Sequence, residues 1–378
     1  MSLKIAQIET CVVNYSVAGD FKFFDGPPGK PRGRPAVVVK IVADDGTVGW
    51  GQSIPSPRWS YETLETVETT IRCYLSRELL GQDPFDIKSL HSRMDRAIAG
   101  SFSRGQPICK AGIDLALFDL TGKRLNQPAH ERWNRSPGNG VTLSWTLNPR
   151  SLDDVEQQIA LGFERGYRHF NLKVAPDPKF DLELCRQVRI LAPHAFVWVD
   201  ANGGYDPATA VQLAPQFAEL GIRAFEQPVP ANRLSGYARL KKQGALPIIM
   251  DEGIVSLVDL EEFHRLRLLD GVAVKVARCG GVTEARRQIE FLEQNGLIFM
   301  ASGLTDPDLS LAASVALFSA YNLQYPAALN GLQFLTTSLL QNPLKLHGDC
   351  IQAPVDPGLG VSVDEERLRE LRIAPLNE

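Results

Sequence analysis

Five charged residues follow short apolar segments at regular intervals in the middle of the chain. They are Lys173 in "NLKV", Asp200 in "WVDAN", Glu226 in "FEQP", Asp251 in "IMDE" and Lys275 in "AVKVA". Successive members are 27, 26, 25 and 24 residues apart, about the length of one strand–helix unit. In a barrel of parallel strands the chemistry lies at the carboxyl ends of the strands, so this spacing predicts that the five side chains meet in one site.

The three carboxylates of this series predict a metal site. Acids brought together in a partly dry cavity repel one another unless a cation neutralises them. Oxygen ligands suit a hard divalent cation, so Asp200, Glu226 and Asp251 indicate Mg²⁺, with Mn²⁺ as an alternative. One such acid alone could equally well cap a helix or pair with an arginine, and the regular spacing of all three favours metal binding. Adjacent strand residues point to opposite faces, so we expect Asp251 to be the ligand and Glu252 to support the substrate or shuttle a proton.

The two lysines flank the carboxylates along the chain, one before them and one after. This order suits removal of the proton next to a substrate carboxylate, because a metal can hold the carboxylate and stabilise the enediolate that forms. Each lysine can then act as base or acid on its own face. A single lysine at a strand end is more often an ion-pair partner, so it is the pair around the acids that predicts catalysis by Lys173 and Lys275.

The overall composition is that of a globular protein with two domains. Of its 378 residues, 44% are hydrophobic and 22% are charged, as in most globular proteins. The length of the chain exceeds that of a protein with a single hydrophobic core. A net charge of −4 argues against nucleic acid as a partner. Six scattered cysteines without a CxxC pair fit a reducing compartment. No apolar run resembles a signal peptide or a membrane helix, so we expect a cytoplasmic protein without membrane contact.

The elements that must position the site change character along the chain. Residues 1–128 combine two β-rich segments, the second of which contains a "DDGT" hairpin turn, with three helical segments. This combination predicts an α+β domain. Residues 129–350 alternate apolar strands with amphipathic helices, which predicts a (β/α) barrel. An open doubly wound sheet is the alternative, although no GxGxxG follows the first strand. Residues 351–378 are expected to pack back on the first domain. The eight predicted strands are 141–147, 168–175, 195–201, 222–228, 246–252, 270–278, 297–303 and 327–334.

Taken together, these segments resemble the enolase superfamily in its muconate-lactonising and mandelate-racemase branch. The matching segments span nearly the whole chain: "AGIDLALFDLTGKRLNQP", "FNLKVAPD", "WVDANGGYD", "FEQP", "MDEG", "VKVARCGGVTEA" and "PVDPGLGVSVDEERL". The resemblance implies an α+β capping domain over a modified (β/α)7β barrel, with Mg²⁺ held by Asp200, Glu226 and Asp251. Lys173 and Lys275 match the acid/base lysines of the muconate-lactonising type. The mandelate-racemase type uses a histidine near the end of the seventh strand, where this chain has "IFMASGLTDPD". The resemblance also suggests a homo-oligomer.

The chain departs from the family pattern at three positions. Asn171 replaces the first lysine of a Lys-x-Lys pair, Gly253 replaces a serine, and Asn330 replaces an acid on the eighth strand. An amide at position 171 cannot depress the pKa of the next lysine by like-charge repulsion, but it can bind substrate. We expect Asn171 and Asn330 to contact the substrate, together with Asn202 and Ser302.

In the family, substrate specificity comes from two loops of the cap. Here these loops correspond to residues 17–30, which contain Phe24 among other aromatic residues, and residues 55–62, which contain Trp59. Exposed aromatic side chains between glycine and proline suggest a lid that excludes water and contacts the substrate. Ordinary packing between the cap and the barrel is the alternative interpretation.

These observations predict a Mg²⁺-dependent enzyme that acts on a small carboxylic acid or amino-acid derivative. The expected reaction is racemisation, epimerisation or cycloisomerisation, since two opposed lysines can return a proton to either face. A lyase of the same superfamily, such as an acid dehydratase or an o-succinylbenzoate synthase-like enzyme, is the first alternative. A non-catalytic metal-binding barrel is the second.

Overall fold

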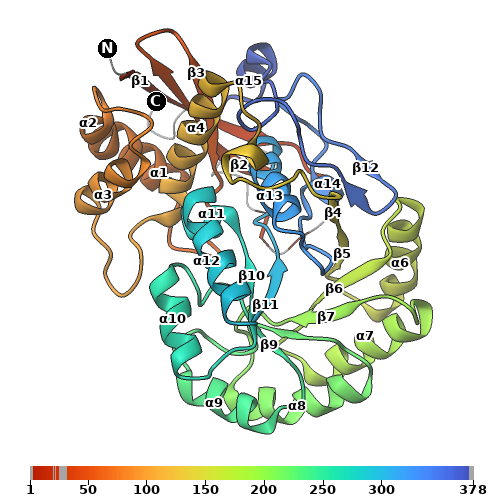
Figure 1. The fold of residues 1–378 in the computed structure, drawn as a ribbon. Coiled ribbons are helices and arrows are strands. Elements are labelled where there is room, and N and C mark those ends of the chain that lie inside the picture. The colour runs from red at the N-terminus through yellow and green to blue at the C-terminus, as the bar shows by residue number, and fades with distance from the viewer. Residues whose placement is uncertain (1–2, 20, 22, 25–31, 374–378) are drawn as a thin grey trace.

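The computed structural model describes residues 3–19, 21, 23–24 and 32–373. A sheet with helices forms a cap, and a curled sheet of parallel strands with helices on its outer side follows it (Figure 1). The predicted class, a capping domain followed by a modified barrel, is therefore confirmed. Among the described residues, no helix combines the length and the apolar character that crossing a membrane requires.

The cap begins with an antiparallel sheet of three strands in sequence order: β1 (Ile5–Tyr15), β2 (Arg34–Ala43) and β3 (Val48–Ser53). The "DDGT" turn joins β2 to β3 as predicted, with the Ala43 amide donating to the Thr47 carbonyl at 2.9 Å. Gly46 has φ +87° in this turn, a conformation that a residue with a side chain rarely adopts.

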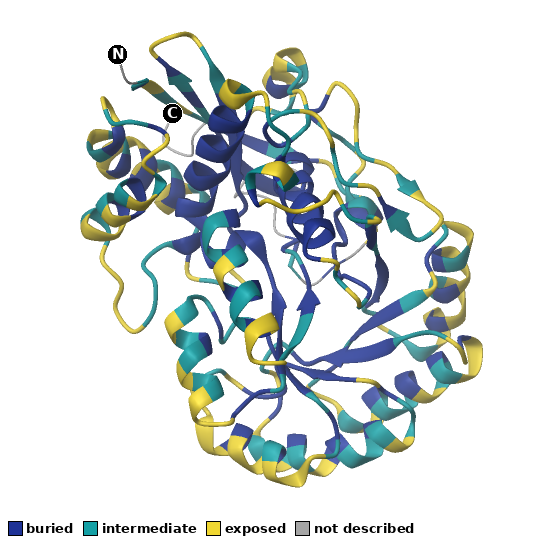
Figure 2. Ribbon diagram, viewed as in Figure 1, coloured by how far each residue is buried: buried dark blue, intermediate teal, exposed yellow. Residues whose placement is uncertain are grey.

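One long helix of the cap lies against this sheet. Residues 107–122 of α4 (Pro107–Leu125) are all buried, and the helix contacts both β2 and β3 (Figure 2). A Cβ at Gly51 of β3 would lie 2.0 Å from the Gly112 carbonyl oxygen, so glycine allows the strand and the helix to approach. The other helices of this part are α1 (Leu64–Thr70), the π-helical turn η1 (Ile71–Leu75), α2 (Ser76–Leu79), α3 (Ile87–Ala97) and α5 (Ala129–Arg132).

Seven parallel strands form the barrel sheet, in the order of the sequence. They are β5 (Ser144–Leu147), β6 (His169–Lys173), β7 (Val197–Asp200), β8 (Phe225–Glu226), β9 (Ile248–Met250), β10 (Gly271–Val274) and β11 (Ile298–Ala301). The predicted eighth strand, 327–334, is largely wrong. Only isolated bridges, from Leu143 to Ala327 and from Ser302 to Ala328, occupy its position, and α14 (Gly331–Phe334) follows. α14 begins at Gly331, so the chain becomes helical where the strand was expected to continue.

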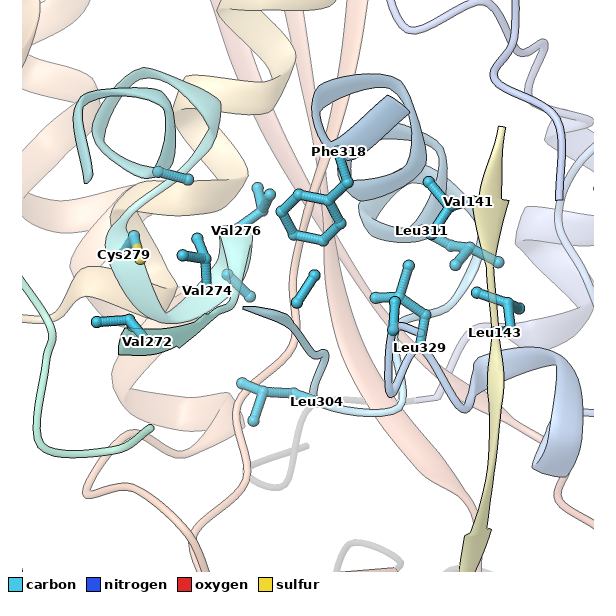
Figure 3. Close-up of a cluster of buried hydrophobic side chains, with 14 of the residues drawn as sticks. Val141, Leu143, Val272, Val274, Val276, Cys279, Leu304, Leu311, Phe318 and Leu329 are labelled. Carbon is cyan, nitrogen blue, oxygen red and sulfur yellow. The ribbon is translucent and has the colours of Figure 1, made fainter. Parts of the chain in front are cut away.

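Helices cover the outer side of the barrel, and α13 (Asp308–Ala320) is buried along its whole length (Figure 2). Its apolar side chains meet those of β10 and β4 (Val141–Thr142) in one core (Figure 3). The remaining helices are η2 (Leu152–Asp154), α6 (Val155–Glu164), α7 (Pro178–Leu191), α8 (Pro207–Glu219), α9 (Leu234–Gln243), α10 (Leu257–Arg265), α11 (Val276–Cys279) and α12 (Val282–Gln294).

The last part of the chain returns towards the cap. β12 (Leu346–His347) and β13 (Cys350–Ile351) form a small sheet with β4, and α15 (Glu365–Leu371) follows. Arg372 forms a bridge with Val13 of β1. The domain boundaries at residues 128 and 350 stay predictions.

Candidate metal centre and active site

Three carboxylates meet where β7, β8 and β9 end. Asp200 and Glu226 are the last residues of β7 and β8 and pair across the sheet, and Asp251 follows β9 directly. All three are buried, and one oxygen of each lies within 4.8 Å of the others. Glu226 Oε1 has no hydrogen-bond partner among the described residues. Hard divalent cations such as Mg²⁺ prefer oxygen ligands, so a buried cluster of three carboxylates with an unused oxygen fits such an ion.

Neighbouring groups hold each carboxylate in position. Asp200 accepts from the backbone amide of Asn202 at 2.8 Å and from its side-chain amide at 3.2 Å. The indole nitrogen of Trp198 donates to Glu226 Oε2 at 2.7 Å. The backbone amide of Asp251 donates to the side chain of Gln227 at 2.9 Å. The carboxylates of Asp200 and Glu226 and the backbone at Asp251 are therefore held before any ligand binds, which lowers the cost of assembling the site.

Three cations surround the acids. Lys173, the last residue of β6, donates to Asp200 Oδ2, and Lys275, which follows β10, lies 2.5 Å from Asp251 Oδ2. Arg278 binds the other oxygen of Asp251. The side chains of the two lysines are only 8% and 4% exposed. The structure therefore brings together all five charged residues that the spacing predicted.

The close charges shift the pKa values of these groups in opposite directions. Burial, together with the charges of Asp200 and Asp251, raises the pKa of Glu226 to about 8. Burial alone would raise the pKa of Asp251, but Lys275 and Arg278 outweigh it and lower that pKa. Burial alone would lower the pKa of Lys173, but Asp200 and Glu226 raise it instead. The site is electrostatically coupled, as expected for a functional cluster.

A small cavity of about 20 Å³ lies over this cluster. Both lysines line it, as do Asn202, Ser302 and Asn330, all of which were predicted to contact substrate. Trp59 of the cap also lines the cavity, with its ring centroid 4.5 Å from Lys275 Nζ. The space suffices for about one water molecule, so the cap closes tightly over the charged groups.

Neutral polar side chains lie on β5, on β6 and in the segment after β11, beside the strands that carry the charged residues. Asn171 is fully buried on β6, and neither atom of its amide has a hydrogen-bond partner among the described residues. It faces Thr146 of β5 across the sheet. Asn330 donates to the Thr146 hydroxyl at 3.4 Å, while its own oxygen has no partner among the described residues. Asn171 is not one of the residues that line the cavity.

Besides Asn171, two more residues that were predicted to contact the substrate do not line this cavity. Phe24 packs against Phe21 and Phe334, and Phe21 and Phe23 line the cavity in its place. Glu252 lines a different, larger cavity that adjoins the site at Trp59. Of the predicted loop 17–30, positions 20, 22 and 25–30 lie outside the described residues.

Sequence reasoning missed three residues that shape the site. Arg34 is buried and donates to the carbonyls of Ile54, Pro55 and Leu304 at 2.8, 2.7 and 2.8 Å, so it joins a cap loop to the barrel. Arg278 stands three residues after Lys275, a spacing that places both on one face of a helical turn. Gln227, in "FEQP", holds the loop after β9. Of these three residues, only Arg278 could have been found from the sequence, through its spacing from Lys275.

Comparison with known protein families assigns both parts of the chain. Residues 154–367 match the enolase C-terminal domain-like family, and residues 31–131 match the N-terminal domain of mandelate racemase / muconate lactonizing enzyme. The chain therefore belongs to the mandelate racemase and muconate lactonizing enzyme branch of the enolase superfamily.

Individual relatives include two kinds of isomerase. The chain is 30% identical to a chloromuconate cycloisomerase from Cupriavidus necator over 339 residues. This region covers 88% of this chain and 90% of that protein. It is 27% identical over 350 residues to an N-succinyl-L-Arg/Lys racemase from Bacillus cereus, with 90% of each chain covered. Among solved structures, 2-chloromuconate cycloisomerase from Rhodococcus opacus superposes with a TM-score of 0.89 at 25% identity, over 99% of this chain and 100% of that one.

Proposed function

We propose that this protein is a metal-dependent isomerase that removes the proton next to the carboxylate of a small carboxylic acid or amino-acid derivative. The observation that carries the proposal is the position of Lys173 and Lys275 at the two ends of the carboxylate row, where both line one small cavity. The proposed outcomes are racemisation, epimerisation or cycloisomerisation. Relatives that are named for cycloisomerisation and for racemisation support this range.

Mg²⁺ is the proposed cofactor, with Mn²⁺ as the alternative, and Asp200, Glu226 and Asp251 are its proposed ligands. The donor set consists of carboxylate oxygens alone, and Glu226 Oε1 is free among the described residues to accept a ligand. When bound, the ion would hold the substrate carboxylate and stabilise the negative charge that develops on it.

The two lysines are the proposed acid and base. The Nζ of one lysine, as a free amine, accepts the α-proton, and the Nζ of the other, as an ammonium, returns a proton to the opposite face. The charges of Asp200 and Glu226 keep Lys173 protonated, against the effect of burial. Neutralisation of those two carboxylates therefore favours the free amine that a base requires.

Neutral polar groups are proposed to orient the rest of the substrate. Asn202, Ser302 and Asn330 line the cavity beside the lysines, and the amide oxygens of Asn202 and Asn330 have no partner among the described residues. Asn171 lies two residues before Lys173 on the same side of β6, and its amide also has no partner there. Buried amides without partners are costly, so a bound substrate or water that pairs with them would recover that free energy.

The test is hydrogen exchange in D₂O with Mg²⁺ present. A panel of N-acyl amino acids, dipeptides, proline derivatives, sugar acids and muconate-type diacids is incubated with the protein, and NMR follows loss of the α-proton and the products formed. We expect at least one class to exchange. Lys173→Met and Lys275→Met should each slow the reaction by about 10²- to 10⁴-fold.

Lys179→Met is the matched control, because Lys179 is exposed at the start of α7 and lies away from the site. It should leave the exchange rate unchanged. Normal exchange of both stereoisomers by either lysine variant of the site would contradict the assigned roles.

A further inference from the structure

The cap loop 55–62 brings Trp59 to the active site. Trp59 lines the cavity over the metal site and also the larger cavity beside it, whose volume is about 570 Å³. Its ring centroid lies 4.5 Å from Lys275 Nζ, a distance at which an aromatic face attracts an ammonium group. A shift of Trp59 therefore changes both the surroundings of Lys275 and the shape of the two cavities.

One end of this loop is fixed by a buried arginine. The guanidinium of Arg34 donates to the carbonyls of Ile54 and Pro55 at 2.8 and 2.7 Å. The backbone amide of Trp59 donates to the Ser56 carbonyl at 2.9 Å, so the chain turns directly after this anchor. The position of Trp59 then depends on how the other end of the loop is held.

The other end of the loop supplies hydrogen-bond acceptors to the start of α4. A helix leaves its first backbone amides without partners inside the helix. The hydroxyl of Tyr61 accepts from the amide of Gln106 at 2.8 Å. The carboxylate of Glu62 accepts from the amides of Ile108 and Cys109 at 2.8 and 2.7 Å. The residue between Gln106 and Ile108 is a proline without an amide hydrogen, so Tyr61 and Glu62 together satisfy the start of the helix.

Glu62 is well placed to anchor the loop, because its buried carboxylate is bound through both oxygens. The partial positive charge at the start of a helix favours a carboxylate there. Residues 107–122 of α4 are themselves buried in the cap, so the partner of Glu62 is a firmly packed element. A carboxylate held at two points fixes the backbone that carries it, three residues after Trp59.

We propose that Glu62 is a positioning residue of the active site: its carboxylate binds the loop to the start of α4 and thereby holds Trp59 against Lys275. The consequence for catalysis rests on the proposed function, because Lys275 is the proposed acid or base. With Trp59 in place the loop keeps water from Lys275, and a loosened loop admits water. The anchor itself does not depend on the reaction.

Protonation of Glu62 offers a way to weaken this anchor without a mutation. Burial raises the pKa of Glu62 to about 7, although the amides of Ile108 and Cys109 and the charge of Lys110 act in the opposite direction. The titratable groups that interact with this carboxyl include Cys109 and Lys110 on α4 and Tyr61 beside it. A protonated carboxyl uses one oxygen as a donor, so the loop should loosen as the pH falls through about 7.

Quenching of tryptophan fluorescence by acrylamide measures how firmly the loop holds Trp59. Each of the other four tryptophans of the chain is buried, and the quenching measured in a Trp59→Phe background is subtracted. Glu62→Gln should raise the quenching constant of Trp59 by at least about twofold, because the amide has one acceptor fewer and no charge. Glu65→Gln is the matched control, since Glu65 is exposed in the first turn of α1, and it should leave the constant unchanged.

The pH dependence separates positioning of Trp59 from a general loss of structure. In the wild-type protein the quenching constant of Trp59 should fall as the pH rises through about 7, and Glu62→Gln should lack this step. Thermal melting confirms that Glu62→Gln folds, and the wild-type profile keeps the inference testable if it does not. Equal quenching constants in Glu62→Gln and Glu65→Gln, or a wild-type constant that does not change through about pH 7, would overturn the inference.

Kinetics on the substrate found by exchange test whether Glu62 acts through Trp59. Glu62→Gln should lower kcat/KM in the wild-type background and have no further effect in a Trp59→Leu background, because the effects of residues that act through one another are not additive. Equal losses in both backgrounds would make Glu62 a structural residue and overturn the positioning role. Quenching needs no substrate, so absence of exchange on every substrate would count against the proposed function alone.

Discussion

The mouth of the barrel is divided into a charged arc and a neutral arc. The charged arc runs from β6 to β10 and carries Lys173, Asp200, Glu226, Asp251 and Lys275. The neutral arc comprises Ser302 just after β11, Asn330 just before α14, Thr146 on β5 and Asn171 on β6, the strand that it shares with the charged arc.

The two arcs differ in how their polar atoms are satisfied. In the charged arc, each lysine is paired with a carboxylate. In the neutral arc, the amide of Asn171 and the oxygen of Asn330 have no partner among the described residues. Paired charges shift pKa values and can move protons, whereas neutral amides can orient a ligand but cannot titrate near neutral pH. The comparison suggests that one arc performs the chemistry and the other selects what is bound.

The largest effect beyond that of the lysines is expected from removing a carboxylate of the charged arc. Glu226→Gln should weaken Mg²⁺ binding by more than about 100-fold. Loss of a metal ligand weakens binding more than loss of a group that only orients a ligand. Calorimetric titration measures this, with the exposed Glu156→Gln on α6 as the control. Equal Mg²⁺ affinity in both variants would show that Glu226 of the charged arc is not a metal ligand.

The pH dependence of metal binding tests the coupling within the charged arc. The pKa of Glu226 is raised to about 8, so below that pH the ion must displace a proton from this carboxyl. Mg²⁺ affinity should therefore rise with pH, by about tenfold per unit for one proton released, and level off above pH 8. Calorimetry at constant ionic strength gives the slope. A flat profile would show that Glu226 is already ionised at neutral pH.

Asn171 provides a test of the neutral arc that separates stability from function. Asn171→Leu removes a buried amide without partners and should raise the free energy of unfolding by about 1–3 kcal/mol. The same change should weaken substrate binding or turnover while leaving Mg²⁺ affinity unchanged. Urea denaturation and metal titration provide the two measurements. A loss of stability together with full activity would make Asn171 a structural residue.

The smallest effect is expected at Asn330. Asn330→Ala removes a side chain that lines the cavity and donates a long hydrogen bond to Thr146. It should change KM by up to about tenfold, the range of one neutral hydrogen bond, and leave kcat within a similar factor. Steady-state kinetics on the substrate found by exchange gives both values. A fall in kcat as large as that of a lysine variant would show that the neutral arc also takes part in the chemical step.

Much of the charged arc could be predicted from the sequence because each member ends an apolar strand at a regular spacing. Parallel strands place such residues at one end of a barrel, so no contact between distant segments had to be guessed. The neutral arc was predicted less well. The segment 327–334 looks like a strand, but only two bridges form before α14 begins. Phe24 is aromatic like Phe21 and Phe23, and only packing decides which of them line the cavity.

The sequence by itself determined the class of fold, the acid trio and the two lysines, because strand periodicity and the length of the βα unit are local properties of the chain. The tertiary structure alone decided how the cap closes the site through Arg34 and where Trp59 lies. It also decided that Arg278 binds Asp251 beside Lys275. These features depend on the meeting of cap and barrel segments far apart in sequence, and no local pattern encodes the distance between two loops.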